Sequence, residues 1–236
     1  MKKDNGAIGI LGGMGPEASA QLVNILVEMS AKEFGAKNGD EFPEIILDSI
    51  PVPDFISNKK NMPVAFRMLE RRIKMMEKMN IKVFAIACNT AHIMLNKLRL
   101  VSKKPFVSLV DEVVRQLMNQ GFGKVGILAT PVTINSRLFQ EPLNQANIEL
   151  ITPSKNQFRT LDAIIRKVIA GEISRLDKLR LIGIAKSLKK KGAQGIILGC
   201  TELPLVFPKD FIIPTFDSLE ILARALLRRH FGESTN

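Results

Sequence analysis

The sequence predicts an α/β protein of two similar lobes, each with a parallel sheet flanked by helices. Apolar, β-branched runs of strand length alternate with longer segments of helical periodicity, which is typical of parallel sheets covered on both faces. The 236 residues suffice for one large α/β domain or two small ones, and the 46% of hydrophobic residues can form a sizeable core. The same strand pattern also restarts halfway along the chain.

The first half begins with an apolar strand and then a helix whose first turn contains Pro16, a residue suited to that position. In this helix Ala18, Leu22 and Leu26 recur on one face, as expected for a helix that packs on a sheet. The expected strands are Ile8–Leu11, Ile45–Ile50, Val83–Ala87 and a short Phe106–Leu109, and the expected helices start at Pro16, span Pro63–Met79 and follow directly after Ala87.

The second half repeats this alternation behind the turn residues Gly121 and Gly123. Its expected strands are Val125–Ala129, Ile148–Ile151, Gly195–Leu198 and Ile212–Pro214, and its expected helices are Gln157–Ala170, Ser174–Lys190 and Ser218–Arg229. We therefore expect a first lobe of residues 1–112 plus 215–236, which holds Cys88, and a second lobe of residues 113–214, which holds Cys200.

Two pairs of segments indicate that the halves are related. Residues 6–11 read GAIGIL and residues 123–128 read GKVGIL, while 83–91 read VFAIACNTA and 195–203 read GIILGCTEL. Lobes related by a pseudo-twofold would place both cysteines at the carboxyl ends of strands, where open α/β sheets bind ligands. This pattern predicts an active site between the lobes.

The formal charge of +11 could indicate that the protein binds nucleic acid. The chain has no Trp or Tyr for base stacking and no recognisable nucleic-acid motif, so we interpret its scattered lysines and arginines as solvated helix faces. A positive field would also attract small dianions. The apolar run at 7–11 is too short for a signal peptide, and no run reaches the roughly 18 residues of a membrane span. We expect a cytoplasmic protein with no nucleic-acid or membrane partner.

The two cysteines are the strongest chemical signal. Cys88 and Cys200 each end an apolar strand, have a Thr within two residues and precede an expected helix start. A helix N-terminus stabilises a thiolate, and a thiolate can remove a proton from carbon and return it. Two such groups on opposite sides of one carbon can invert a stereocentre. The alternatives are a disulfide, which is less expected in a cytosolic enzyme, and two small buried hydrophobic side chains.

A glycine-rich segment follows the first strand and reads GILGGMGPE over residues 9–17. A strand, glycines and a helix start are typical of an anion site. The loose match to a dinucleotide fingerprint is weak, because Pro16 lacks the N–H that a pyrophosphate needs and Glu33 falls at the end of a helix instead of a strand. We interpret Gly13 and Met14 as part of a pocket floor whose backbone N–H groups meet a substrate carboxylate.

Five polar residues lie just after strands and can donate hydrogen bonds to carboxylates. They are Asn89, Thr90, Thr130, Thr133 and Thr201. These residues could also act as helix N-caps, and the two roles are compatible. His92 stands four residues after Cys88 and supports a rival reading as a Cys–His hydrolase, although this leaves Cys200 unexplained. With two distant cysteines and two histidines in the chain, we expect no metal site.

Three motifs in order resemble the aspartate/glutamate racemase superfamily, and within it the aspartate racemase branch. They are GILGGMGP at 9–16, ACNTAH at 87–92 and GCTELP at 199–204, and the resemblance spans essentially the whole chain. It implies a two-lobed α/β fold, no pyridoxal phosphate or other cofactor, no metal, a homodimer, and racemisation by two cysteines. It also implies that Cys88 serves the D enantiomer and Cys200 the L enantiomer.

Departures from the family pattern bear on the substrate. The glutamate racemase branch carries an acidic residue in the first motif and a His after Cys-Thr in the last, where this chain has Gly-Gly-Met and Glu202. Aspartate racemases of this kind can carry an Arg after Pro-Asp in the loop of the second strand, where this chain has Phe55. We expect Lys167, helped by Thr133, to replace that Arg as partner of a second carboxylate, and we count Glu202 among the substrate-binding residues.

These observations predict a racemase of aspartate or a similar acidic amino acid that uses Cys88 and Cys200 as its two acid/base groups. Their sulfurs should lie roughly 7–8 Å apart, because one carbon must be within reach of both. An isomerase or decarboxylase of a related dicarboxylate, similar to maleate isomerase, or a hydantoin racemase is the alternative on the same scaffold. A small-ligand-binding protein on a degenerate scaffold is the non-enzyme alternative.

Overall fold

The computed structural model describes residues 6–56 and 59–232. It contains two parallel sheets flanked by helices, which confirms the expected α/β class. The chain divides into a first unit, made of the described residues of Met1–Leu109 and Leu219–Asn236, and a second unit, Val110–Ser218. None of the described helices is long and apolar enough to cross a membrane.

The first unit is built on a three-stranded parallel sheet in the order β2-β1-β3. The strands are β1 (Ala7–Gly12), β2 (Ile45–Ser49) and β3 (Ile81–Ile86). Every residue of the central strand β1 is buried, as expected for a strand covered on both faces.

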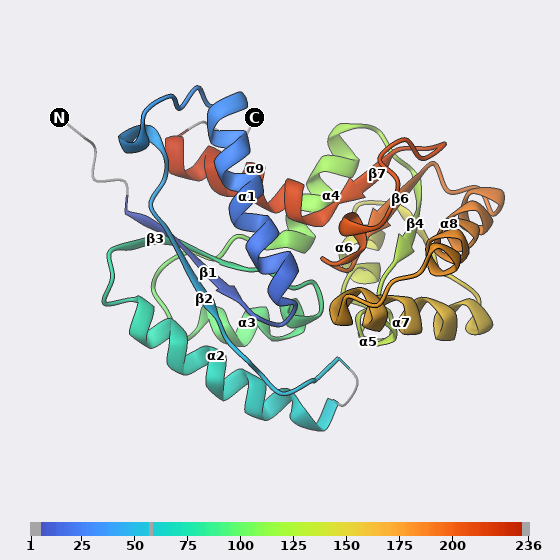
Figure 1. The fold of residues 1–236 in the computed structure, drawn as a ribbon, viewed down its shortest axis with the longest axis horizontal. Coiled ribbons are helices and arrows are strands. Elements are labelled where there is room, and N and C mark those ends of the chain that lie inside the picture. The colour runs from blue at the N-terminus through green and yellow to red at the C-terminus, as the bar shows by residue number, and fades with distance from the viewer. Residues whose placement is uncertain (1–5, 57–58, 233–236) are drawn as a thin grey trace. The chain divides into compact units, whose positions relative to one another are not determined.

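Helices cover both faces of this sheet because the chain crosses β1 in opposite directions. It moves from β1 to β2 through α1 (Pro16–Lys32) and then back past β1 to β3 through α2 (Met62–Met76), and right-handed crossovers place these helices on opposite faces. Figure 1 shows α1 and α9 (Ser218–Phe231) on one side of the sheet and α2 with α3 (Leu95–Arg99) on the other. Among its described residues this unit also contains the 3-10 helices η1 (Gly39–Glu41), η2 (Lys59–Asn61) and η3 (Thr90–Met94).

The second unit has a four-stranded parallel sheet in the order β5-β4-β6-β7. Its strands are β4 (Lys124–Leu128), β5 (Glu149–Ile151), β6 (Gly195–Leu198) and β7 (Thr215–Asp217). In each unit the first strand of the unit lies between the second and the third. The repeated sequence segments therefore fold with the same strand order.

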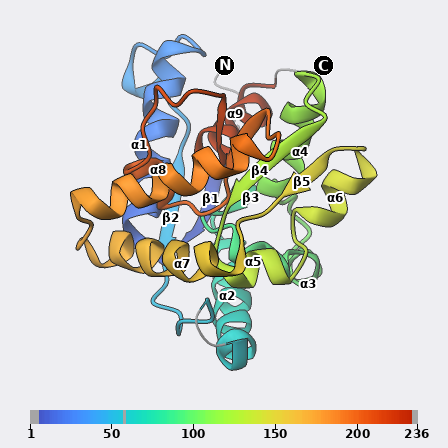
Figure 2. The same cartoon turned by 90° about the vertical axis from the view of Figure 1, so that its right-hand side faces the viewer.

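The helices of the second unit begin with clear capping signals. Ser154 and Ser174 each form a capping box at the start of α7 (Lys155–Ala170) and α8 (Arg175–Lys190). Figure 2 shows α7 and α8 side by side as a pair. The remaining helical segments are α4 (Leu109–Asn119), α5 (Pro131–Asn135), α6 (Gln140–Gln145) and the 3-10 helix η4 (Leu203–Leu205).

Two expected short strands are wrong. Residues 106–109 form a single bridge between Phe106 and Phe84, because the chain turns into α4 at Leu109 before a ladder can extend. Residues 212–214 precede the last strand, which starts at Thr215, because Pro214 has no N–H to donate and contributes only its carbonyl, to Ile196 N. The sequence reading also omitted α4, α5 and α6.

Candidate active site

Cys88 and Cys200 occupy equivalent positions in their units. Each lies two residues after its strand, β3 or β6, and just after the last residue whose N–H bonds to the central strand. These last bonds are Ala87 N to Leu11 O at 2.9 Å and Gly199 N to Leu128 O at 2.8 Å. Both cysteines are free thiols with 5% of their surface exposed. The expectation that they follow carboxyl ends of parallel strands therefore fits the geometry.

The local helix after each thiol differs from the expectation. Among the described residues, the segment after Cys88 is the 3-10 helix η3, which continues into the five-residue α3, and the segment after Cys200 is the three-residue η4. Neither is a long α-helix whose N-terminus could stabilise a thiolate through its dipole. The charge state of each thiol must therefore depend more on neighbouring side chains and backbone groups.

His92 binds backbone groups on both sides of its ring. Leu109 N donates to His92 Nε2 at 3.0 Å, so this nitrogen carries no proton and Nδ1 does. Nδ1 then donates to the carbonyl oxygen of Cys88 at 2.8 Å. The ring, with 5% of its surface exposed, joins the loop of Cys88 to the start of α4.

This arrangement weighs against the Cys–His hydrolase reading. A general base for a cysteine must present a ring nitrogen to the sulfur. In this chain both ring nitrogens of His92 bind the backbone, one of them the carbonyl of Cys88 itself. His92 therefore fixes the position of the Cys88 loop. Asn89 and Thr90, the two residues after Cys88, are buried, and Asn89 makes no side-chain cap at the start of η3.

Cys200 lies beside a carboxylate. Its Sγ donates to Glu202 Oε2 at 3.0 Å, and the hydroxyl of Thr201 donates to the same oxygen at 3.0 Å. All three side chains are buried. Thr201 and Glu202 lie together beside the thiol, and the expectation that both bind substrate stays a prediction. The sequence pattern Cys-Thr-Glu placed the carboxylate near the cysteine, but it could not specify which oxygen meets which donor.

The glycine-rich loop has a backbone path that only glycine adopts easily. Gly13 has a φ of 86°, and a Cβ there would lie 2.3 Å from Ile50 N. Its N–H donates to the hydroxyl of Ser19 at 3.0 Å, so that group shapes the loop and is not directed at a carboxylate. Met14 is buried at the loop's end. Ser19, which sequence reasoning missed, holds the loop against the first turns of α1.

Thr130 has the capping role that was its alternative interpretation, and Thr133 is the residue that it caps. Thr130 is the N-cap of α5, where its hydroxyl oxygen accepts from Thr133 N at 3.2 Å and donates to Thr133 Oγ1 at 3.0 Å. Thr130 follows β4 as Gly13 follows β1, so the same place in the two units contains a capping threonine and a left-handed glycine. Substrate binding by either threonine stays a prediction.

The Lys167 ammonium already has a carboxylate partner. Lys167 Nζ donates to both oxygens of Asp177 at 3.0 and 2.9 Å. The hydroxyl of Ser174, donating to Asp177 at 2.6 Å, is the main cause that lowers the Asp177 pKa from 3.8 to about 2, followed by Lys167. This pairing weighs against Lys167 as the cation for a substrate carboxylate. Phe55, in the place where an Arg was sought, is buried in the core of the first unit.

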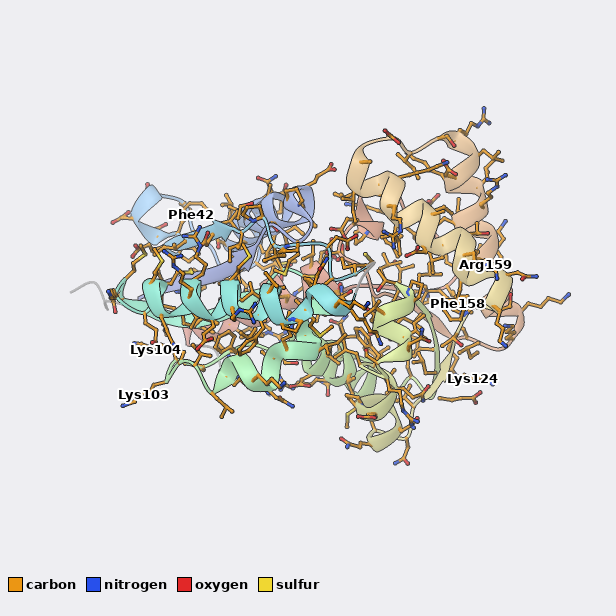
Figure 3. All side chains as sticks on the ribbon, turned by 90° about the horizontal axis from the view of Figure 1, so that it is seen from below. Phe42, Lys103, Lys104, Lys124, Phe158 and Arg159 are labelled. Atoms are coloured by element: carbon orange, nitrogen blue, oxygen red, sulfur yellow. The ribbon has the colours of Figure 1, made fainter. Side chains whose placement is uncertain are left out.

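Some of the basic residues lie on outward-facing segments of the two units. Figure 3 shows Lys103 and Lys104 on an outer loop of the first unit and Arg159 on α7 of the second, with side chains pointing into solvent. Several other basic residues form ion pairs within their own helix, such as Lys74 with Glu70 and Arg166 with Asp162. Within the described part of the chain, no three His, Cys, Asp or Glu side chains gather closely enough to hold a metal ion.

Each of the two parallel α/β units carries a buried thiol at an equivalent strand end. The family model of Asp/Glu/Hydantoin racemases matches residues 11–226. The chain therefore belongs to the Asp/Glu/Hydantoin racemase family, which confirms the resemblance seen in its motifs.

Individual relatives agree along almost the whole chain. A broad specificity amino-acid racemase of Bacillus subtilis, RacX, is 26% identical over 231 residues, which cover 95% of this chain and 98% of that protein. The structure of an aspartate racemase from Picrophilus torridus matches with a TM-score of 0.83 and 27% identity over 96% of this chain and 95% of that one. An aspartate racemase homologue from Pyrococcus horikoshii matches with a TM-score of 0.80 and 29% identity, covering 95% and 99% of the two chains.

Proposed function

We propose that this protein interconverts the L and D forms of an amino acid by moving its α-proton between Cys88 and Cys200. The observation that carries the proposal is the equivalence of the two thiols, each of which follows the third strand of its unit at the same distance. A single buried cysteine is commonly a small hydrophobic side chain, but two at matched positions are explained by a reaction that needs two similar groups.

The reaction needs one thiolate and one thiol. The thiolate removes the α-proton and becomes a thiol, leaving a carbanion, and the opposite thiol gives its proton to the other face of that carbon and becomes a thiolate. The α-carbon is thus inverted and the two sulfurs exchange their protonation states. The proposal requires both units to present their strand ends to one substrate, with the sulfurs roughly 7–8 Å apart.

Uncharged donors support the carbanion intermediate. Asn89 and Thr90 directly follow Cys88 and are buried, which supports a role for their fixed dipoles where the proposal places the developing negative charge. His92 stabilises this loop through the Cys88 carbonyl. We assign these groups to carbanion stabilisation and to holding the substrate carboxylate.

Aspartate is the substrate that we propose first, because the structural relatives with the higher similarity include an aspartate racemase. The test incubates the pure protein with L-aspartate and L-glutamate in D₂O and follows exchange of the α-proton by NMR, with optical rotation to detect inversion. We expect exchange and inversion of aspartate. If the protein catalyses neither exchange nor inversion of any amino acid in a broad panel, the proposal is refuted.

A broader substrate range is the second candidate, and the Lys167–Asp177 ion pair favours it. With that ammonium engaged, we expect Lys167→Met to leave the ratio of aspartate to alanine turnover unchanged. If Lys167 instead bound the second carboxylate of aspartate, this ratio would fall. Lys186→Met, at an exposed position of α8, serves as the control.

A further inference from the structure

The environment of Cys200 differs from that of Cys88 because it contains a carboxyl group. Glu202 stands two positions after Cys200, whereas Thr90 stands two positions after Cys88. Glu202 Oε2 accepts hydrogen bonds from Cys200 Sγ and from Thr201 Oγ1, each at 3.0 Å, and these side chains have 4%, 5% and 2% of their surface exposed. The contact is therefore an internal one whose strength is little screened by solvent.

We propose that Glu202 is a positioning residue that holds the proton on Cys200, so that in the resting protein Cys200 is the acid and Cys88 is the base. An ionised carboxylate only accepts hydrogen bonds, so it orients the S–H of Cys200 and gains from it. Once Cys200 loses this proton, two negative charges face each other in a buried place. The role in catalysis rests on the proposed racemisation.

A charged pair lies on the helices that precede this motif in the chain. The helix α7 packs against η4, just after Glu202, and its Lys167 is paired with Asp177 of α8. These two charges neutralise each other in place. Thr201 instead strengthens the effect, because its hydroxyl fixes the Glu202 oxygen that the thiol meets.

A directional cycle follows from this assignment. The resting protein is ready for the enantiomer whose α-proton faces Cys88, which by resemblance is the D form. After one turnover Cys200 is a thiolate beside a carboxylate and Cys88 is a thiol. The resting state returns when Cys200 removes the α-proton of an L enantiomer while Cys88 protonates the carbanion, or when Cys200 takes a proton from solvent while Cys88 releases one to solvent. Glu202 thereby sets which form of the free enzyme is more populated without changing the equilibrium between the enantiomers.

The test measures the thiol itself in single-cysteine variants. Cys88→Ala leaves Cys200 as the one thiol, since the chain has two cysteines. In this background we expect Glu202→Gln to raise the rate of reaction with iodoacetamide at neutral pH at least about tenfold, because alkylation follows the thiolate fraction. Glu202→Asp should give a smaller rise, and Thr201→Val one between those two. Glu172→Gln, at an exposed position of the same unit, should change nothing.

A second readout does not depend on reagent access. In the Cys88→Ala background Cys200 should show the low-frequency infrared S–H stretch of a hydrogen-bonded thiol, and Glu202→Gln should move this band upward. An unchanged band and an unchanged alkylation rate in Glu202→Gln would overturn the inference, as would equal changes at Cys88. Both readouts report on the thiol alone, so they separate this inference from the proposed racemisation, which could fail while the thiol still responds to Glu202.

Discussion

The two cysteine loops arise from similar sequences and end in different surroundings. The loop of Cys88 is held through its backbone, by the ring of His92, and continues into the uncharged Asn89 and Thr90. The loop of Cys200 is held through its sulfur, by the carboxylate of Glu202. Equivalent places on repeated units thus acquire different electrostatic character through single residues, while the strands beneath keep the same order.

Under the proposed mechanism, this difference shows how a repeated scaffold can support a reaction that needs unlike groups on the two sides of one carbon. Inversion of a carbon needs a base on one side and an acid on the other. Two identical surroundings would favour neither assignment, whereas a carboxylate beside one thiol does. The common strand geometry provides the position of each sulfur, and the residue two places further on provides its preferred state.

The largest expected effect comes from removing either sulfur. We expect Cys88→Ser and Cys200→Ser each to lower racemisation at least about a hundredfold, because a hydroxyl is a much weaker acid/base group than a thiol. Slow one-sided exchange of the α-proton in D₂O should survive in each variant for opposite enantiomers. Near wild-type racemisation in either variant, measured by optical rotation, would remove the two-thiol mechanism. Exchange with the enantiomers swapped would overturn only the facial assignment.

The next effect concerns the glycine loop that follows β1 in the first unit. Gly13→Ala should destabilise the protein by about 1–3 kcal/mol or more, because alanine is strained at this φ and its Cβ would meet the backbone of Ile50. Gly35→Ala is the matched control, since Gly35 has a φ of 77° and a Cβ there meets nothing within 4 Å. Urea unfolding should show the larger loss for Gly13→Ala, and equal losses would contradict the close approach to Ile50.

His92→Phe tests the backbone attachment of the Cys88 loop. The ring volume remains but Leu109 N and Cys88 O lose their partner, which should lower stability by about 1–3 kcal/mol. In single-cysteine backgrounds the alkylation rate should change at Cys88 and stay constant at Cys200. A change at Cys200 alone would show that His92 does not act on the loop that it contacts.

The smallest effects concern pH and should distinguish the units. In the first unit, burial and then the charge of Lys82 lower the His230 pKa below 6.5, so its contribution to stability is complete above that pH and falls as pH drops below it. In the second unit, the Asp177 pKa is lowered from 3.8 to about 2, so its contribution is present above 3.8 and is lost as pH falls toward 2.

Hydrogen–deuterium exchange, resolved by peptide, should show these windows separately. Protection around α9 should weaken as pH falls below about 6.5, the reference value for histidine, while protection around α8 persists to more acidic pH. His230→Gln should flatten the first dependence and Asp177→Asn the second. Loss of protection in both units over the same pH range, in every variant, would contradict the assignment to these residues.

Much of the fold could be predicted because its signals are local and repeated. The strand Gly195–Leu198 and the start of α1 at Pro16 follow from apolar runs and from the preference of proline for a first helical turn. The errors lie where one non-local contact decides the outcome. Whether residues 106–109 continue as a strand depends on Leu109 N, which is bound to His92, and no local pattern reveals that contact.

The candidate site was predicted as a set of residues, but not as a set of contacts. The motifs identified Cys88, Cys200 and Glu202, yet the role of Glu202 depends on which donor reaches its oxygen. Lys167 was selected by its charge, and Asp177, ten positions further on, already binds it. The domain limits at 112 and 215 stay predictions, since similar halves in a sequence do not specify where each folds independently.

The return of α9 to the first unit also has a consequence for biosynthesis. Arg224 pairs with Glu33 through two bonds of 2.9 and 2.8 Å, and Lys82 Nζ donates to His230 O at 2.9 Å, so the helix is tied to α1 and to β3. A ribosome makes these partners nearly 150 residues or more before α9, with the whole second unit in between. The second unit, a continuous segment, can acquire its sheet during translation, whereas the first waits for its last helix. Until then the nascent first unit exposes the surface that α9 will cover. During this interval we expect a chaperone to bind that surface most readily.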